Sequence, residues 1–345
     1  MTARRRIVLH IGTEKTGSTA LQGALYRHRA LLMEHGVAYC HSPGRQEARG
    51  IAAAALGNKA PDDYLRQLNC ESGEAREAFR RREVEALQSE LASLPASVHT
   101  VILSSEHFHS RLRQPAQLVW LKDVLEPFAS SFEVVVYLRR QVDLLASFYS
   151  TQLKNGGTLA LEETGKRVCH PRNHYYNYRK VIELWADVFG AEALRVRLFT
   201  SDFLQGRSIQ EDFLSALECP EAMSAPERHN ESLIPAGQVM LRALNKRLGE
   251  LSDDAEDERE ALNALRAGLV REYKGSGQLL EPSQAAQIQA AFEPGNEWVR
   301  QAYFSAHERL FEPVAENYGA GRERLTAISE TQLELAEREG EMLGR

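Results

Sequence analysis

The sequence predicts an α/β fold whose central sheet is mostly parallel, and three observations lead to this prediction. Short apolar runs of the length of a buried strand alternate with longer stretches that have helical periodicity. The first run leads directly into a glycine-containing loop. From about residue 227 onward the strand-like runs stop, and only helical patterns follow. With 345 residues, of which 43% are hydrophobic and 26% charged, the chain is long enough for one large α/β core and an appended part.

Four runs of β-branched and apolar residues predict the strands. They read IVLHIGT from Ile7, VHTVILSSE from Val98, FEVVVYLRR from Phe132 and LRVRLFTSD from Leu194. Each run ends in polar or turn-forming residues. Runs of this kind, separated by helical stretches, are typical of buried strands in a parallel sheet.

The helices are expected between and after these runs. The stretch ALQGALYRHRALLMEHG has apolar residues at helical spacing and ends at Gly36, which suits a helix C-cap. A charged stretch over residues 74–94 predicts an exposed amphipathic helix. Two further amphipathic helices are predicted, one starting at Gln141 and one ending at Gly190. Helices in these places can connect parallel strands.

Charge and cysteine content exclude several classes of protein. The formal net charge of -6 and the pI near 6.0 argue against general nucleic-acid binding, which needs a basic surplus. Four cysteines lie far apart without a CxxC pair, which indicates free thiols in a reducing compartment. The apolar run after the N-terminal arginines is too short for a signal peptide, and no later run has membrane-spanning length. We therefore expect a soluble, cytoplasmic protein.

The loop HIGTEKTGST, residues 10–19, has the setting of an anion site. A strand is expected before it and a helix from about Ser18, and the unpaired amides at a helix start favour phosphate or a similar oxyanion. Gly12 and Gly17 keep the spacing of the GxxxxGK[ST] loop, but Ser18 occupies the lysine position and the lysine is residue 15. This departure weakens the interpretation as a kinase or an ATPase. Lys15 could instead reach over a bound phosphate towards the group that is transferred.

The segment EKTGSTALQ resembles the 5′-phosphosulfate loop of the sulfotransferases that use 3′-phosphoadenosine 5′-phosphosulfate (PAPS). This resemblance implies that Lys15 and the donors of residues 16–19 hold the phosphosulfate. Those donors are Thr16, Gly17, Ser18 and Thr19.

A second segment, VVVYLRRQVDLLASFYS, is similar to the part of the same family that binds the 3′-phosphate. In the family an arginine at a strand end and a serine eight residues later bind this group, and these positions match Arg139 and Ser147. Arginine suits the task because its planar fork binds phosphate oxygens in pairs. The family often has proline two residues after the arginine, where this chain has Gln141. Arg140 could replace Arg139 as the ligand, or could pair with Asp143 on the surface.

The resemblance extends over most of the chain, including residues 175–199, 228–246 and 296–304, which are similar to bacterial sulfotransferases. It implies a three-layer α/β/α fold related to the P-loop NTPases, PAPS as donor, PAP as product and no metal. We expect a single domain over residues 1–345. Its α/β nucleotide-binding core would span 1–225 with a helical insert at about 40–97, and residues 226–345 would form a helical C-terminal part.

The candidate base follows the second predicted strand. Transfer to a hydroxyl or amine requires removal of a proton, and a positioned Glu or His is the usual agent. The segment ILSSEHFHS offers Glu106 first and His107 second, whereas we expect His109 to be a surface or packing residue. Because ligands of parallel sheets sit outside the carboxyl ends of the strands, this segment should lie near the loop and Arg139. Neither the two histidines nor the CHPRNH segment supplies a full set of metal ligands.

The sequence thus predicts a sulfotransferase acting on a carbohydrate or small metabolite, with catalytic residues Lys15, Glu106 and His107. Two alternatives stay open. A P-loop kinase would require magnesium and ATP, and a non-catalytic nucleotide- or glycan-binding module would keep the loop without the chemistry. The identity of the acceptor and the oligomeric state carry no readable signal in the sequence.

Overall fold

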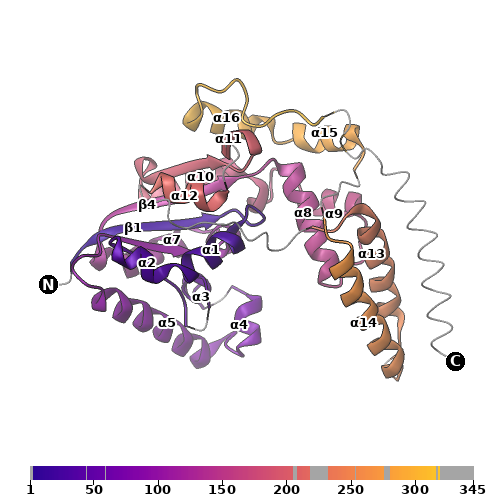
Figure 1. Ribbon diagram of the computed structural model, residues 1–345, viewed down its shortest axis with the longest axis horizontal. Coiled ribbons are helices and arrows are strands. Elements are labelled where there is room, and N and C mark those ends of the chain that lie inside the picture. The colour runs from indigo at the N-terminus through magenta and orange to yellow at the C-terminus, as the bar shows by residue number, and fades with distance from the viewer. Residues whose placement is uncertain are drawn as a thin grey trace. The chain divides into compact units, whose positions relative to one another are not determined.

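A computed structural model of the chain describes residues 3–43, 45–58, 60–204, 208–217, 232–252, 254–275, 280–315 and 318. The chain divides into two compact units. The first comprises Met1–Arg139 and Asn177–His229, and the second comprises Arg140–Tyr176 and Asn230–Arg345. The first unit contains a β-sheet with helices around it, and the second is built from helices (Figure 1).

The sheet of the first unit has five strands in the order β2-β3-β1-β4-β5, and every neighbouring pair is parallel. The strands are β1 Arg5–Gly12, β2 Val37–Cys40, β3 Thr100–Ser104, β4 Ala129–Leu138 and β5 Leu194–Leu198. The predicted α/β class with a parallel sheet is confirmed, and four of these strands lie in the four predicted runs. Strand β2 was not predicted, because its four residues are too few to show a periodicity of their own.

Helices cover both faces of this sheet. Val8, Ile102 and Val135 point to one face, where they share a core with Leu21 of α1 and Phe213 of α12. On β4, Phe132 points to the opposite face because side chains alternate along a strand. There its ring contacts that of Phe189 in α10, with 5.2 Å between the centroids. The three-layer α/β/α arrangement that the resemblance implied is therefore present in the first unit.

The first unit contains short and long helices in chain order. They are α1 Ser18–Arg27, α2 Arg29–Glu34, α3 Arg49–Ala55, α4 Asp63–Gln67, α5 Gly73–Ser93, α6 His107–Arg111, α7 Pro115–Leu125, α10 Tyr178–Phe189, α11 Ser201–Leu204 and α12 Ile209–Ala216, with 3₁₀ turns η1 Glu126–Phe128 and η3 Ala191–Ala193. The helix expected after the glycine loop is split into α1 and α2 at His28.

The charged helix α5 has one buried face, as expected of an amphipathic helix, and the prediction for this segment is confirmed. Phe79 and Leu91 are fully buried, and Arg76 is only 1% exposed. The guanidinium of Arg76 donates hydrogen bonds to the carbonyl oxygens of Gly57 and Ala60. The presence of an arginine on the buried face was not predicted, and it is possible because a paired arginine can be buried.

The second unit contains α8 Gln141–Lys154, α9 Leu161–Val168, η2 His174–Tyr176, α13 Pro235–Glu250, α14 Glu256–Glu272, α15 Pro282–Ala290 and α16 Glu293–Tyr303. Figure 1 shows α13 and α14 lying side by side, and they share a small core around Met240, Leu244 and Leu269. Among the described residues, no helix is both long and apolar enough to cross a membrane.

Gln141, where the resembling family often has proline, has a structural role in the second unit. Its side-chain amide donates to Oδ1 of Asn296 at 2.7 Å, and its side-chain oxygen accepts from Gln289 at 2.8 Å. The side-chain oxygen of Gln289 in turn accepts from the backbone amide of Val142 at 3.2 Å, in the first turn of α8. This buried amide network joins the start of α8 to α15 and α16.

Candidate active site

The glycine loop connects β1 to α1 in a compact turn. The Oγ1 of Thr16 donates to the carbonyl oxygen of Thr13 at 2.6 Å, and the Oγ of Ser18 donates to the same oxygen at 3.3 Å. The backbone amide of Thr13 donates to the carbonyl oxygen of Tyr137 on β4 at 3.0 Å. The loop is thus held in shape by its own hydroxyl groups and by the neighbouring strand.

Gly17 is the N-cap of α1 and has a φ of 81°, which favours glycine. A Cβ at this position would lie 3.1 Å from Cγ2 of Ile209. The helix start has neither a side-chain cap nor an acidic residue in its first turn. The positive end of α1 therefore suits an anion, as the sequence predicted.

The side chains of the loop differ in what they can offer an anion. Lys15 is half-buried and Thr19 is exposed. Thr16 and Ser18 are buried, and their hydroxyl groups donate hydrogen bonds within the loop. Backbone amides and Lys15 are consequently better anion donors in this arrangement than the two buried hydroxyl groups.

Arg139 follows β4 directly and faces the loop. Its Nη1 donates to the carbonyl oxygen of Lys15 at 2.9 Å, and its guanidinium carbon lies 5.9 Å from the ring centroid of Phe199. The hydroxyl of Tyr178 donates to the carbonyl oxygen of Arg139. These contacts fix the residue at the carboxyl end of β4, beside the glycine loop.

Arg140 has a different role from Arg139. It forms an ion pair with Asp143 at 2.9 Å and donates to the carbonyl oxygens of Glu312 and Pro313. Of the two alternatives for Arg140, the structure shows the pair with Asp143. Ser147 lies half-buried on α8 of the second unit, and its pairing with Arg139 on a 3′-phosphate stays a prediction.

Glu106 lies between β3 and α6, close to the end of β1. A Cβ on Gly12 would lie 3.1 Å from Cα of Glu106, so the glycine permits this close approach. The side-chain amide of Gln22, on α1, donates to Oε2 of Glu106 at 2.7 Å. The predicted base is therefore linked directly to the helix that follows the glycine loop.

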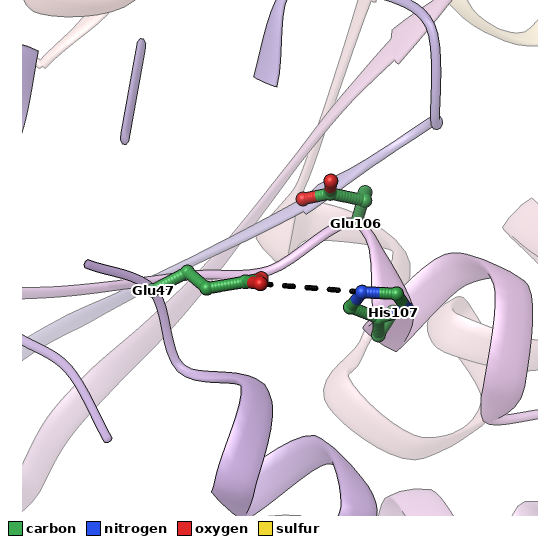
Figure 2. Close-up of side chains that lie close together, drawn as sticks. All are labelled: Glu47, Glu106 and His107. Carbon is green, nitrogen blue, oxygen red and sulfur yellow. Dashed lines mark ion pairs between the residues drawn. The ribbon is translucent and has the colours of Figure 1, made fainter. Parts of the chain in front are cut away.

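A second acidic residue of the site, Glu47, was not predicted from the sequence. Glu47 follows β2, and its Oε1 lies 4.0 Å from Nε2 of His107 (Figure 2). The hydroxyl of Ser105 donates to Oε2 of Glu47 at 2.9 Å. Because β2 runs parallel to β3, the residues after both strands meet at one edge of the sheet. If β2 had been recognised in the sequence, its position next to β3 would have placed Glu47 near Glu106 and His107.

Burial dominates the titration of these three groups. It raises the pKa of Glu106, and together with the charge of Glu106 it raises the pKa of Glu47 to about 7. Burial also lowers the pKa of His107 to about 3, with Arg49 and Arg111 adding to the effect. At neutral pH the imidazole of His107 is therefore uncharged.

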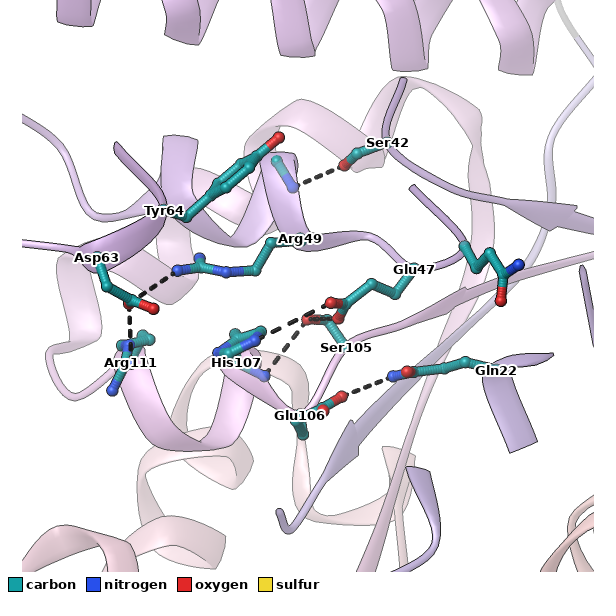
Figure 3. A network of polar contacts seen from close by, with 12 residues as sticks. Gln22, Ser42, Glu47, Arg49, Asp63, Tyr64, Ser105, Glu106, His107 and Arg111 are labelled. Carbon is teal, nitrogen blue, oxygen red and sulfur yellow. Dashed lines mark hydrogen bonds and ion pairs between the residues drawn. The ribbon is translucent and has the colours of Figure 1, made fainter. Parts of the chain in front are cut away.

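Figure 3 shows the polar network around this imidazole. Arg49 is 3% exposed and pairs with Asp62 at 2.6 Å and with Asp63 at 3.3 Å. Arg111 pairs with the same two carboxylates, at 3.4 and 3.0 Å. The two positive charges beside His107 are thus balanced by two negative ones. His109 is fully buried, as expected of a packing residue.

Among the described residues, one set of three side chains could offer ligand atoms to a single cation. These are Glu47, Glu106 and His107, whose ligand atoms lie within 4.8 Å of one another. The CHPRNH segment is not such a set, since Cys169 is buried and its thiol donates to the carbonyl oxygen of Gln141 at 3.9 Å. The same three groups could equally share protons.

The site places the carboxylate of Glu106 beside a glycine loop and the start of α1, at the carboxyl ends of the strands of a parallel α/β sheet. The chain matches no protein-family model and no curated protein sequence. Among solved structures it is similar to a sulfotransferase from Alicyclobacillus acidocaldarius, at 18% identity and a TM-score of 0.39, over 78% of this chain and 95% of that chain.

Two further solved structures are similar to the chain. One is the sulfotransferase domain of the Synechococcus PCC 7002 olefin synthase, at 13% identity and a TM-score of 0.35, over 85% of this chain and 96% of that one. The other is the sulfotransferase domain from the curacin biosynthetic pathway, at 11% identity and a TM-score of 0.34, over 66% and 79%. Because the identities and TM-scores are this low, we infer no function from these three similarities. The function proposed below is argued from the residues of the site.

Proposed function

We propose that this chain is a sulfotransferase that moves a sulfonate group from PAPS to a hydroxyl or amine of a carbohydrate or small metabolite. One observation carries the proposal: three segments meet at the carboxyl ends of β1, β3 and β4. Hydrogen bonds of 2.9 Å from Arg139 to Lys15 and of 2.7 Å from Gln22 to Glu106 join them. Ligands of parallel sheets bind at such an edge.

The residues of the first unit suit an anionic donor. Lys15 and the backbone amides of residues 17–19 would hold the 5′ end, because the start of α1 has no acidic residue and no side-chain cap. Arg139 would bind the 3′-phosphate, together with Ser147 as the sequence predicted. PAPS, when bound, supplies the sulfonate as an electrophile and PAP as the leaving group.

Glu106 is the better of the two candidate bases. A general base works best when its pKa lies near the working pH, and burial moves the pKa of Glu106 upward towards that range. The pKa of His107, about 3, makes its imidazole a weak proton acceptor. We therefore assign removal of the acceptor's proton to Glu106 and leave His107 as a neutral neighbour.

The reaction balances without a redox partner or a metal ion. The acceptor O–H or N–H bond breaks and its proton goes to Glu106, while a bond forms between the acceptor atom and sulfur. The bond between sulfur and the phosphate oxygen breaks, and Lys15 stabilises the charge left on that oxygen. Catalysis then consists mostly of positioning and charge stabilisation, as in phosphoryl transfer.

The two rival functions make different predictions. A P-loop kinase uses a lysine in the position of Ser18, whereas here the Ser18 hydroxyl donates to Thr13 within the loop. A non-catalytic binding module has no need for a buried carboxylate held by an amide, as Glu106 is by Gln22. Both features favour the transferase.

A thermal-shift comparison tests the donor class. We expect PAP to raise the melting temperature more than AMP or ATP with magnesium, because a ligand selective for the folded state stabilises it by mass action. Single-turnover transfer of label from PAPS to members of an acceptor panel then tests the reaction. A larger shift with ATP and magnesium would favour the kinase, and donor binding without any transfer would favour the binding module.

A further inference from the structure

We infer that Glu47 is a positioning residue that acts through Glu106: the two carboxylates form a pair that keeps one proton, so that only one negative charge faces an incoming anionic donor. This inference rests on the proposed function and adds to it Glu47, which belongs to no recognisable sequence motif. It explains how an anionic donor can bind close to the carboxylate of Glu106.

The geometry places the pair close together on separate elements. Glu47 comes from the segment after β2, and Glu106 from the segment after β3. One side-chain oxygen of each, together with one ring nitrogen of His107, lie within 4.8 Å of one another. Figure 2 shows the carboxyl group of Glu47 facing the imidazole of His107, with the carboxyl group of Glu106 beside them.

Each of the two carboxylates accepts a hydrogen bond from a neutral side chain. Ser105 donates to Glu47 at 2.9 Å, and Gln22 donates to Glu106 at 2.7 Å. Neither donor neutralises charge. Two carboxylates at this separation in a largely buried setting cannot both ionise at little cost, and one proton between them removes the repulsion.

The charged and titratable groups facing the pair leave the pKa values of both carboxyl groups raised. They are Glu14 and Lys15 of the loop, Tyr39 of β2, Arg45 before α3, Arg49 at the start of α3, and His107 and Arg111 of α6. Arg49 and Arg111 are committed to Asp62 and Asp63. The imidazole of His107 is neutral for the reason given above.

Burial and the charge of Glu106 raise the pKa of Glu47 to about 7, so Glu47 is the member of the pair that holds the proton on the acid side of neutrality. Glu106 then stays ionised and accepts the proton of the acceptor. After transfer both carboxyl groups are protonated, and one proton leaves to solvent. A donor that carries sulfonate and phosphate groups meets a single carboxylate charge instead of two.

The first test needs no donor or acceptor: urea unfolding from pH 4.5 to 8.5 for the wild type and Glu47→Gln. A carboxyl group whose pKa is raised in the folded state stabilises the fold below its unfolded pKa, and that contribution is lost as pH rises through the folded pKa. Glutamine mimics the protonated group at every pH. We therefore expect the Glu47→Gln variant to have the higher urea midpoint at pH 8.5, with the difference vanishing towards pH 4.5.

The control for this test is Glu85→Gln, a change of the same kind at an exposed position of α5. Its midpoint should follow that of the wild type at every pH. A Glu47→Gln midpoint that differs from the wild type by the same amount across the range would overturn the inference. So would stabilisation of the wild type, but not of Glu47→Gln, by micromolar Mn²⁺ or Zn²⁺, because a cation would then occupy the place assigned to the proton.

The second test measures the dissociation constant of PAP at pH 6.5 and 8.5 by calorimetry. In the wild type we expect affinity to fall roughly tenfold at the higher pH, because ionised Glu47 adds a second negative charge near the anion. The fall should be absent in Glu47→Gln, and an equal fall in both proteins contradicts the inference. If PAP does not bind at all, the proposed function fails, while the unfolding test still decides whether the pair holds a proton.

Discussion

Gln22 and Glu106 are joined by a 2.7 Å hydrogen bond between the first helix after the glycine loop and the segment after β3. Gln22 is 6% exposed, and its side-chain amide also donates to the hydroxyl of Ser104 at 3.3 Å. The bond means that whatever fixes the anion loop also fixes the carboxylate. In the proposed mechanism, the hydrogen bond between Gln22 and Glu106 would therefore position the general base relative to the sulfonate donor.

Gln22→Ala should therefore impair transfer more than it impairs folding. Loss of the amide leaves Glu106 without its donor, and we expect kcat/KM to fall about 10- to 100-fold because the base is no longer oriented. The free energy of unfolding should fall by only about 1–2 kcal/mol. Steady-state kinetics and urea unfolding check both numbers, with Gln88→Ala on α5 as the control. Equal kinetic parameters in the wild type and Gln22→Ala would refute the positioning role.

Glu106→Gln should separate binding from chemistry. The variant keeps the shape of the side chain and cannot take a proton, so single-turnover transfer should slow by roughly 10²- to 10⁴-fold. PAP affinity at pH 7 should stay within a few-fold of the wild type. His107→Gln is the matched comparison and should reduce transfer much less. A stronger loss in His107→Gln than in Glu106→Gln would reverse the assignment of the base.

Lys15→Ala tests the loop lysine. Lys15 is half-buried and its carbonyl oxygen, which receives the bond from Arg139, is kept in the variant. We expect the transfer rate to drop by about 10²- to 10³-fold, since a charge that stabilises the leaving group is lost. The melting temperature should change little. An unchanged rate would remove Lys15 from the mechanism.

Gly17→Ala should damage the anion site through the backbone. A φ of 81° is unfavourable for alanine, and the added Cβ would lie 3.1 Å from Ile209. We expect a loss of about 1–2 kcal/mol in unfolding free energy, together with loss of PAP binding. Gly249→Ala on α13 is the contrasting variant, because nothing lies within 4 Å of its added Cβ. That change should be neutral or stabilising by about 0.5–1 kcal/mol.

Gln141→Pro tests the amide network of the second unit. Gln141 is the first residue of α8, a position where proline is tolerated, so the helix itself should persist. What is lost is the pair of bonds to Asn296 and Gln289. We expect faster amide hydrogen exchange in α15 and α16, with exchange in the first unit unchanged. The exposed Gln152→Ala serves as control, and protection of α15 and α16 equal to the wild type would contradict the role of the network.

The sequence predicted the parallel sheet and the loop because both depend on local patterns. β-branched runs, the glycine spacing and the residues after β3 and β4 are contiguous signals. Glu47 could not be found in this way, since its place depends on β2, a strand of four residues recognisable only by its pairing with β3. The bond between Gln22 and Glu106 is likewise a product of tertiary packing, with 84 residues separating the partners.

The role of Gln141 also lay beyond the sequence. A departure from a family pattern shows only that something differs, whereas the partners Gln289 and Asn296 lie some 150 positions away, at separations of 148 and 155 residues. The burial of Arg76 in α5 lay beyond the sequence for a related reason. The sequence predicted an amphipathic helix, but the backbone carbonyl groups that let Arg76 lie on its buried face belong to a separate segment.

The hydroxyl groups of Thr16 and Ser18 both donate to the carbonyl oxygen of Thr13, so these hydrogen bonds hold the glycine loop in one shape. Such a loop has its amides oriented before any anion arrives, and little conformational entropy is left to lose on association. Capture of the donor should consequently be fast and limited by diffusion and electrostatic attraction. Its rate constant should fall as ionic strength rises, without a slow rearrangement phase in stopped-flow traces.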